Sequence, residues 1–145
     1  MNKLLLVSLA AFVVTSPAQA KGLKWMGPPP GIPSGAKMAV VKGDPSKEGE
    51  FTIRARLPAN YTVPPHQHPT DEKVSVKSGG PMTYGMGDKM DKANAGSLEK
   101  GYHITMSAKM NHWVSTTDPT EIEITAMGPF AITYVDPKDD PRNAK

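Results

Sequence analysis

The chain of 145 residues contains no cysteine. Disulfide bonds are therefore excluded, and so is a lipid anchor attached to a cysteine. Aromatic residues make up only 6% of the chain. A core of this composition must be stabilised by aliphatic packing and by any metal ion that the protein binds.

The chain also lacks a long hydrophobic run. Its most apolar stretch, residues 4–14, is shorter than the ~20 residues that a membrane-spanning helix needs. Lys3 precedes this stretch and Ala18-Gln19-Ala20 follows it, which predicts a secretory signal peptide over residues 1–20 with cleavage before Lys21. Because secretion without cysteine fits a bacterial periplasm, we expect a periplasmic or secreted protein.

Neither sign of charge dominates. Without Lys3 the chain has 17 − 1 = 16 basic and 14 acidic residues, spread along its length. This balance predicts no nucleic-acid partner, and no membrane association after signal cleavage. The expected partner is a small-molecule ligand or substrate, with a homodimer as a candidate assembly.

Prolines divide the chain. The sequence GPPPGIP at residues 27–33 favours an extended conformation, so residues 21–35 form a predicted N-terminal arm. Residues 36–136 form one predicted domain, and residues 137–145 a C-terminal tail. Only residues 88–95 have a pattern that allows a helical turn or two.

The predicted domain is rich in period-two alternation. In residues 51–57, for example, odd positions are apolar and even positions are polar, which is typical of a half-buried strand. Similar or shorter runs predict strands at residues 38–41, 72–77, 82–86, 102–106, 112–115, 120–126 and 130–134. About eight short strands, separated by Gly- and Pro-containing turns, indicate an all-β barrel or sandwich.

Two of the four histidines form the sequence His66-Gln67-His68, and Glu72 follows. In a strand, residues 66 and 68 point to the same face, so both imidazoles can bind one metal ion. Glu72 has the parity of Val74 and should point inward, where a carboxylate needs a partner such as a metal. Such clusters also occur by chance on surface loops, and these residues alone leave both interpretations open.

Residues 60–79, NYTVPPHQHPTDEKVSVKSG, resemble the first motif of the cupin superfamily, G-x5-H-x-H-x3–4-E-x6-G. Residues 101–112, GYHITMSAKMNH, resemble its second motif, G-x5-P-x-G-x2-H. The surrounding sequence is similar to short secreted cupins of unassigned function. The resemblance implies an all-β, single-domain, jelly-roll β-barrel over residues 36–136. It also implies one metal ion inside the barrel, bound by His66, His68, Glu72 and His112.

The chain departs from both motifs. Asn60 replaces the leading glycine of the first motif, and asparagine tolerates left-handed backbone conformations better than most residues. Ser107 and Lys109 replace the proline and glycine of the second motif, in the turn that presents His112. We expect either strained backbone at Lys109 or a different turn.

Other residues are expected to have structural roles. His103 has the parity of a solvent-facing position, and Trp113 should likewise point outward. Met82, Met86, Met90, Met106 and Met110 are spaced by four residues within two groups, and they are expected to fill the core rather than to bind Cu(I). A second set of side chains either lines the mouth of the barrel or packs in its core: Trp25, Tyr84, Tyr102, Phe130 and Tyr134.

Three imidazoles and one carboxylate suit a divalent ion of Fe, Mn, Ni, Cu or Zn. They also leave coordination positions open for a small molecule. The prediction is a periplasmic metal-dependent enzyme of the oxygenase, isomerase or lyase type. The alternative is a non-catalytic module that binds a small molecule or a metal. A roomy pocket with a further inward polar group would favour the enzyme, whereas a mouth closed by the arm and by methionines would favour the binding module.

Overall fold

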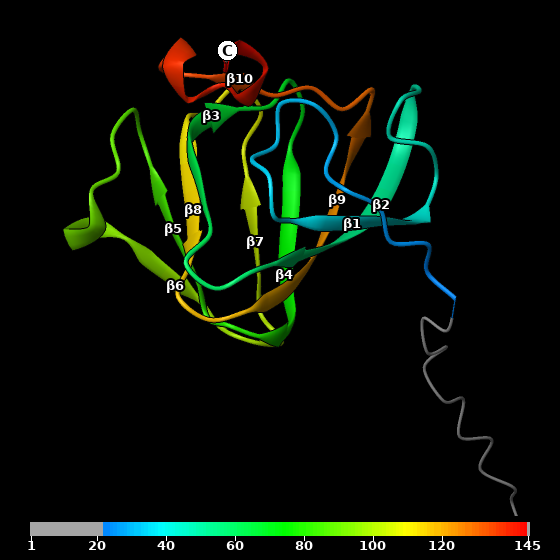
Figure 1. Ribbon diagram of the computed structural model, residues 1–145, viewed down its shortest axis with the longest axis horizontal. Coiled ribbons are helices and arrows are strands. Elements are labelled where there is room, and N and C mark those ends of the chain that lie inside the picture. The colour runs from blue at the N-terminus through cyan, green and yellow to red at the C-terminus, as the bar shows by residue number, and fades with distance from the viewer. Residues whose placement is uncertain (1–21, 145) are drawn as a thin grey trace, which may run out of the picture.

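The structure is a computed structural model that describes residues 22–144 (Figure 1). The predicted signal peptide lies outside these residues. Two five-stranded antiparallel sheets face each other. The first sheet has the order β1-β2-β9-β4-β7 and the second has the order β10-β3-β8-β5-β6. No helix in this part of the chain is long and apolar enough to cross a membrane.

The strands of the first sheet are β1 (Lys37–Lys42), β2 (Gly49–Leu57), β4 (Glu72–Gly79), β7 (His103–Met106) and β9 (Thr120–Gly128). Those of the second sheet are β3 (Thr62–Gln67), β5 (Met82–Met86), β6 (Gly96–Leu98), β8 (His112–Thr116) and β10 (Thr133–Tyr134). Three single 3₁₀ turns complete the fold: η1 (Lys92–Asn94), η2 (Pro137–Asp139) and η3 (Pro141–Asn143). The predicted helical turn at residues 88–95 is therefore only η1.

The longest strands show the alternation of buried and exposed residues that the sequence predicted. In β2 the side chains of Phe51, Ile53, Ala55 and Leu57 are buried, and the residues between them are more exposed. The same pattern in β4 buries Glu72 together with the valines of that strand. This parity brings the carboxylate of Glu72 into the space between the two sheets.

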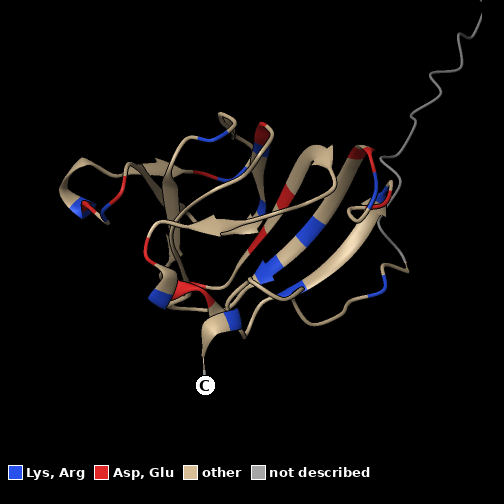
Figure 2. Ribbon diagram, turned by 90° about the horizontal axis from the view of Figure 1, so that it is seen from above, with Lys and Arg blue, Asp and Glu red and all other residues tan. Residues whose placement is uncertain are grey.

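The outer face of the first sheet is polar. Arg54 on β2 donates hydrogen bonds to Glu123 (2.6 Å) and Glu121 (2.9 Å) on β9. Arg56 donates to Glu121 at 3.0 Å. Figure 2 shows the resulting alternation of basic and acidic positions on neighbouring strands. The first sheet therefore has ion pairs between neighbouring strands on its outer face and apolar side chains on its inner face.

Two strands, β3 and β6, were not among those predicted from the sequence. β3 contains Pro64-Pro65, which cannot donate hydrogen bonds to a ladder, and its pairing with β8 shifts register between Val63 and His66. β6 has only three residues, too few to show a period. The predicted strand at residues 130–134 shrinks to the two residues of β10.

The structure adds to one expectation about aromatic residues and corrects another. Trp113 was expected to point outward, and its side chain is fully buried (0% exposed). Its indole lies over Gly85 of β5, where a Cβ atom would come within 2.4 Å of the ring. Tyr102, expected to be inward, is 69% exposed because β7 begins only at His103.

Candidate metal centre

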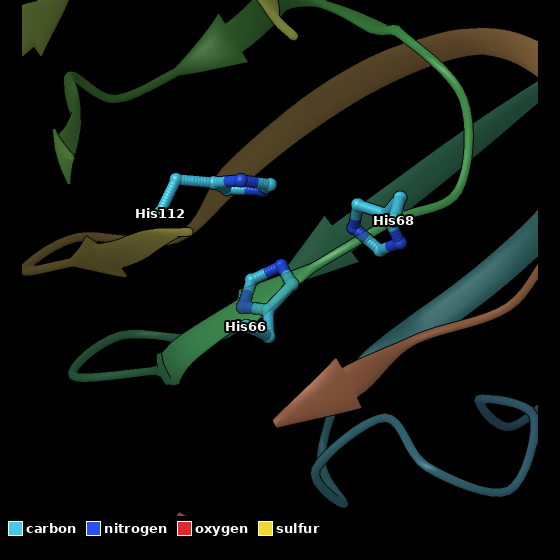
Figure 3. Close-up of side chains that lie close together, drawn as sticks. All are labelled: His66, His68 and His112. Carbon is cyan, nitrogen blue, oxygen red and sulfur yellow. The ribbon is translucent and has the colours of Figure 1, made fainter. Parts of the chain in front are cut away.

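The three buried histidines come from both motifs and meet between the sheets (Figure 3). His66 on β3 and His112 on β8 are direct cross-strand partners, so their side chains leave the sheet on the same face. His68 lies one residue beyond the end of β3. The ring centroids are 4.4 Å apart for His66 and His112 and 4.9 Å apart for His66 and His68.

One nitrogen of each ring is engaged by the backbone. Nδ1 of His66 lies 2.7 Å from the carbonyl oxygen of Pro64, Nδ1 of His68 lies 2.8 Å from that of Ala131, and Nδ1 of His112 lies 2.9 Å from that of Met110. A carbonyl oxygen can only accept, so each Nδ1 must carry the proton and donate it. In the neutral ring the lone pair then resides on Nε2, as in histidines that bind metal through this atom.

The free nitrogens converge. His66, His68 and His112 each offer a nitrogen, and these three atoms all lie within 4.8 Å of one another. No described residue gives Nε2 of His112 a hydrogen-bond partner, although that side chain is only 1% exposed. A buried polar atom without a partner is costly by ~1–3 kcal/mol, and a metal ion at this point would satisfy it. The buried histidine cluster thus fits a metal site.

Glu72 stands next to this cluster. Its Oε2 is 3.6 Å from Nε2 of His112 and 3.7 Å from Nε2 of His68. Burial alone would raise the pKa of Glu72, but the neighbouring histidines outweigh burial and lower it below the usual 4.5. With the ring protons on Nδ1, the nitrogens near this carboxylate present lone pairs, and a divalent cation between them would offset the resulting repulsion. That Glu72 is a ligand remains a prediction.

The fold also disfavours protonation of His66. Burial, together with the proximity of His112 and His68, lowers the pKa of His66 from 6.5 to about 3. His66 is therefore neutral at any pH near 7. Neutral imidazole is the form that binds a metal ion, so the site needs no deprotonation of His66 before binding.

The turn before His112 is built against the first motif. Lys109 has φ +60°, in the left-handed region that favours glycine, which confirms the expected backbone strain. The N–H of Lys109 donates to the carbonyl oxygen of His68 at 2.8 Å, and the N–H of Ala108 donates to the carboxylate of Asp71, also at 2.8 Å. Asn60 has φ +56° in place of the motif's leading glycine.

The histidines face a small cavity of about 50 Å³ between the two sheets. Besides the three histidines and Glu72, its lining contains only one polar side chain, that of Tyr61, whose hydroxyl donates to the carbonyl oxygen of Pro33. The other lining residues are Ile32, Met38, Ile53, Ala55, Leu57, Val63, Val74, Met82, Val114, Ile122, Ile124 and Phe130. Neither Tyr61 nor Ile32 was predicted to line this cavity. Tyr61 lies within the first motif but not at one of its ligand positions, and Ile32 lies in the predicted N-terminal arm.

The remaining histidine and several methionines lie outside the histidine cluster. His103 is exposed on β7, as predicted, and is outside the cluster. Met82 and Met106 are fully buried and fill the core, as predicted. Met86 and Met110 are instead 44% and 50% exposed.

Two facing antiparallel sheets thus enclose a buried histidine cluster. Comparison with solved structures confirms the fold that the two motifs predicted. The chain matches the polyketide cyclase RemF from Streptomyces resistomycificus with a TM-score of 0.67 and 16% identity, over 88% of this chain and 89% of that one. The protein has the cupin fold.

Other similar structures have different activities in their names. A putative acetylacetone dioxygenase from Methylibium petroleiphilum matches with a TM-score of 0.63 and 17% identity, over 92% of this chain and 90% of that one. The DMSP lyase DddQ from Ruegeria pomeroyi matches with a TM-score of 0.60 and 18% identity, over 77% of this chain and 60% of that one. No family model matches the chain, and no curated protein matches it. At these identities the likeness concerns the fold alone.

Proposed function

We propose that the protein binds one divalent ion of Fe, Mn, Ni, Cu or Zn through His66, His68, His112 and Glu72, and acts on a small molecule at that ion in the periplasm. The observation that carries the proposal is the common anchoring of the three Nδ1 atoms. Three neutral imidazoles and one carboxylate complete a donor set that suits these metals.

The preferred activity is catalysis. Four protein ligands leave positions free on a five- or six-coordinate ion, and a free position is what a catalytic metal requires. Bound there, the ion would supply Lewis acidity or redox chemistry to an oxygen-containing small molecule. Fold neighbours named as a cyclase, a dioxygenase and a lyase support an enzyme, although cupin architecture does not by itself select one.

One observation favours the alternative of a binding module. The cavity of about 50 Å³ is small, and its lining offers no acid or base besides the ligand set and Tyr61, whose hydroxyl is already donated to the backbone. Ile32 of the N-terminal arm and the methionines Met38 and Met82 also contribute to its walls. An enzyme of this construction would rely on the metal and on Glu72 for its chemistry.

Metal titration tests the site. Purified apo protein should take up one equivalent of Co(II) or Zn(II), measured by absorbance and by elemental analysis. His66→Ala and His112→Ala should each lower affinity by at least about 100-fold, more than the ~10–100-fold typical of losing a group that only supports a ligand. Glu72→Gln should weaken binding as well. His103→Ala is the control and should bind like the parent.

The outcome of this titration is decisive. Full metal uptake by the His66→Ala and His112→Ala proteins, or loss of uptake in the His103→Ala protein, would reject the ligand assignment. The visible spectrum of the same Co(II)-loaded sample distinguishes an enzyme from a binding module. If acetate changes the visible spectrum of bound Co(II), a coordination position is open to a substrate. A spectrum unaffected by any small anion would favour the binding module.

A further inference from the structure

The N-terminal arm is fastened to the barrel at two adjacent points. The hydroxyl of Tyr134 donates to the carbonyl oxygen of Gly31 at 2.7 Å, and the hydroxyl of Tyr61 donates to that of Pro33 at 2.5 Å. Between these two carbonyls stands Ile32, whose side chain lines the metal cavity. In Figure 1 the arm rises toward the end of the barrel where β3 and β10 lie, and then turns back into β1.

The backbone around Ile32 has little freedom. Gly31 has φ +93°, and a Cβ atom at this residue would come within 3.0 Å of Ile132 and 3.3 Å of the Arg142 guanidinium. Pro33 restricts φ on the other side. Burial raises the pKa of Tyr61 to about 12 and raises that of Tyr134 also, so both phenols remain protonated donors at neutral pH. Ile32 is thus held as a fixed part of the cavity wall.

The cavity has one polar end and an apolar remainder. The histidines and Glu72 provide the polar end, and the rest of the lining is apolar except for the engaged Tyr61 hydroxyl. On the scale where one water needs ~10–15 Å³, a volume of about 50 Å³ holds only a few non-hydrogen atoms. A ligand that fits must therefore combine one small metal-binding group with a short apolar body.

We propose that the site takes small carboxylates or carbonyl compounds with a short apolar chain, and that Ile32, fixed between Tyr61 and Tyr134, sets the longest chain admitted. The inference rests on the proposed metal site and specifies the ligand class. The oxygen group lies at the metal, and the chain extends along the apolar wall. Ile32 determines specificity, whereas Tyr134 is a positioning residue that acts through the arm.

The test is a chain-length series. Acetate, propionate and butyrate are titrated into the Co(II)-loaded full-length protein, and binding is read from the visible spectrum. The parent protein should bind acetate, and bind butyrate at least about tenfold more weakly than acetate, because the cavity of about 50 Å³ holds only a few non-hydrogen atoms. Ile32→Ala removes three carbon atoms from the wall and should abolish this tenfold penalty. Tyr134→Phe, which releases Gly31, should reduce the penalty while the Co(II) affinity stays unchanged.

Two controls separate this wall from its surroundings. Ile104→Ala makes the same change at a half-buried isoleucine of β7 that is not part of the cavity lining, and should leave the penalty intact. Met38 lies between the cavity and an outer groove of about 320 Å³ that borders the arm. If Met38→Ala abolishes the penalty and Ile32→Ala does not, the length limit lies at that groove and the inference is wrong.

A metal-free measurement distinguishes failure of this inference from failure of the proposed function. Benzene or xenon binding to apo protein, followed by NMR, depends on the cavity alone. Ile32→Ala should bind such a probe at least about tenfold more tightly than the parent, and Ile104→Ala should not. If Co(II) does not bind while this difference is seen, the metal proposal and the ligand class that rests on it fail, and the limit that Ile32 sets on the cavity stands. If the probe binds both proteins equally, Ile32 does not limit the cavity.

Discussion

The two histidine-bearing segments of the barrel reach one site by different means. In the first, residues 60–79, short strands and prolines carry His66 and His68, and the backbone supports both rings with carbonyl oxygens. In the second, residues 101–112, the turn before His112 lacks the proline and glycine that cupins normally use there. Lys109 adopts φ +60° instead.

Hydrogen bonds to the first segment hold the turn of the second segment in place. The hydrogen bonds from Lys109 to His68 and from Ala108 to Asp71 tie the turn to the residues around the histidine cluster. Cross-strand pairing of His66 with His112 completes the alignment. His112 therefore lies opposite His66 although its turn lacks the proline and glycine of the second motif, because the neighbouring segment constrains that turn.

The largest effect expected from this comparison concerns pH and the first segment. The folded-state pKa of His66 is about 3, against 6.5 for an unrestrained histidine. Below pH 6.5 the unfolded chain binds a proton at this residue and the folded chain does not, so stability falls as pH falls and is fully retained only above that value. Between pH 7 and pH 5 the apo protein should lose about 2 kcal/mol of unfolding free energy from this residue.

Urea unfolding of apo protein at pH 7, 6 and 5 measures this loss. The His66→Asn protein should show a smaller decrease, and the difference between the two slopes belongs to His66. The pKa of Glu72 is also lowered, and its contribution is lost on acidification too, but only below its usual 4.5. A parent and a variant with equal slopes above pH 5 would show that His66 is protonated as easily in the fold as in the unfolded chain.

The sequence predicted the first segment better than the second. Parity placed Glu72 inward and put His66 and His68 on one face, because period two is the direct geometry of a strand, and the resemblance to the first cupin motif placed both histidines inside the barrel. The same rule did not predict the burial of Trp113. It assumes that the outer face of a sheet is solvated, yet Gly85 on the adjacent strand leaves room for the indole, which is buried.

Contacts between residues far apart in the chain could not be predicted from the sequence. The carbonyl oxygen of Ala131, which accepts the hydrogen bond from Nδ1 of His68, is 63 residues away in the chain, and no local pattern marks it. The fastening of the arm by Tyr61 and Tyr134 depends on how distant segments pack. For the same reason the small size of the cavity could not be predicted, since many side chains from different strands determine it together.

An intermediate effect is expected where the two segments join. Asp71→Ala removes the acceptor for the N–H of Ala108, and loss of one such hydrogen bond costs about 1 kcal/mol of unfolding free energy. Because the turn precedes His112, metal affinity should also fall, by about tenfold. Asp136→Ala removes a similar bond to the N–H of Lys138, away from the site. That control should lose stability alone, and an equal loss of metal affinity in both proteins would contradict the coupling of the segments.

The smallest effect is expected at Lys109 itself. A non-glycine residue in the left-handed region costs ~1–2 kcal/mol, whereas glycine adopts it freely but loses ~0.5–1 kcal/mol through the greater entropy of the unfolded chain. Lys109→Gly should therefore stabilise the apo protein by about 0.5 kcal/mol, measured by urea unfolding. Lys73→Gly, at the second residue of β4, should destabilise it by a similar or larger amount, since only the entropic loss applies there. Metal affinity should stay unchanged in the Lys109→Gly protein, because its hydrogen bond to His68 uses only the backbone. If this protein were less stable than the parent, strain at Lys109 would not be the feature that distinguishes the second segment from the first.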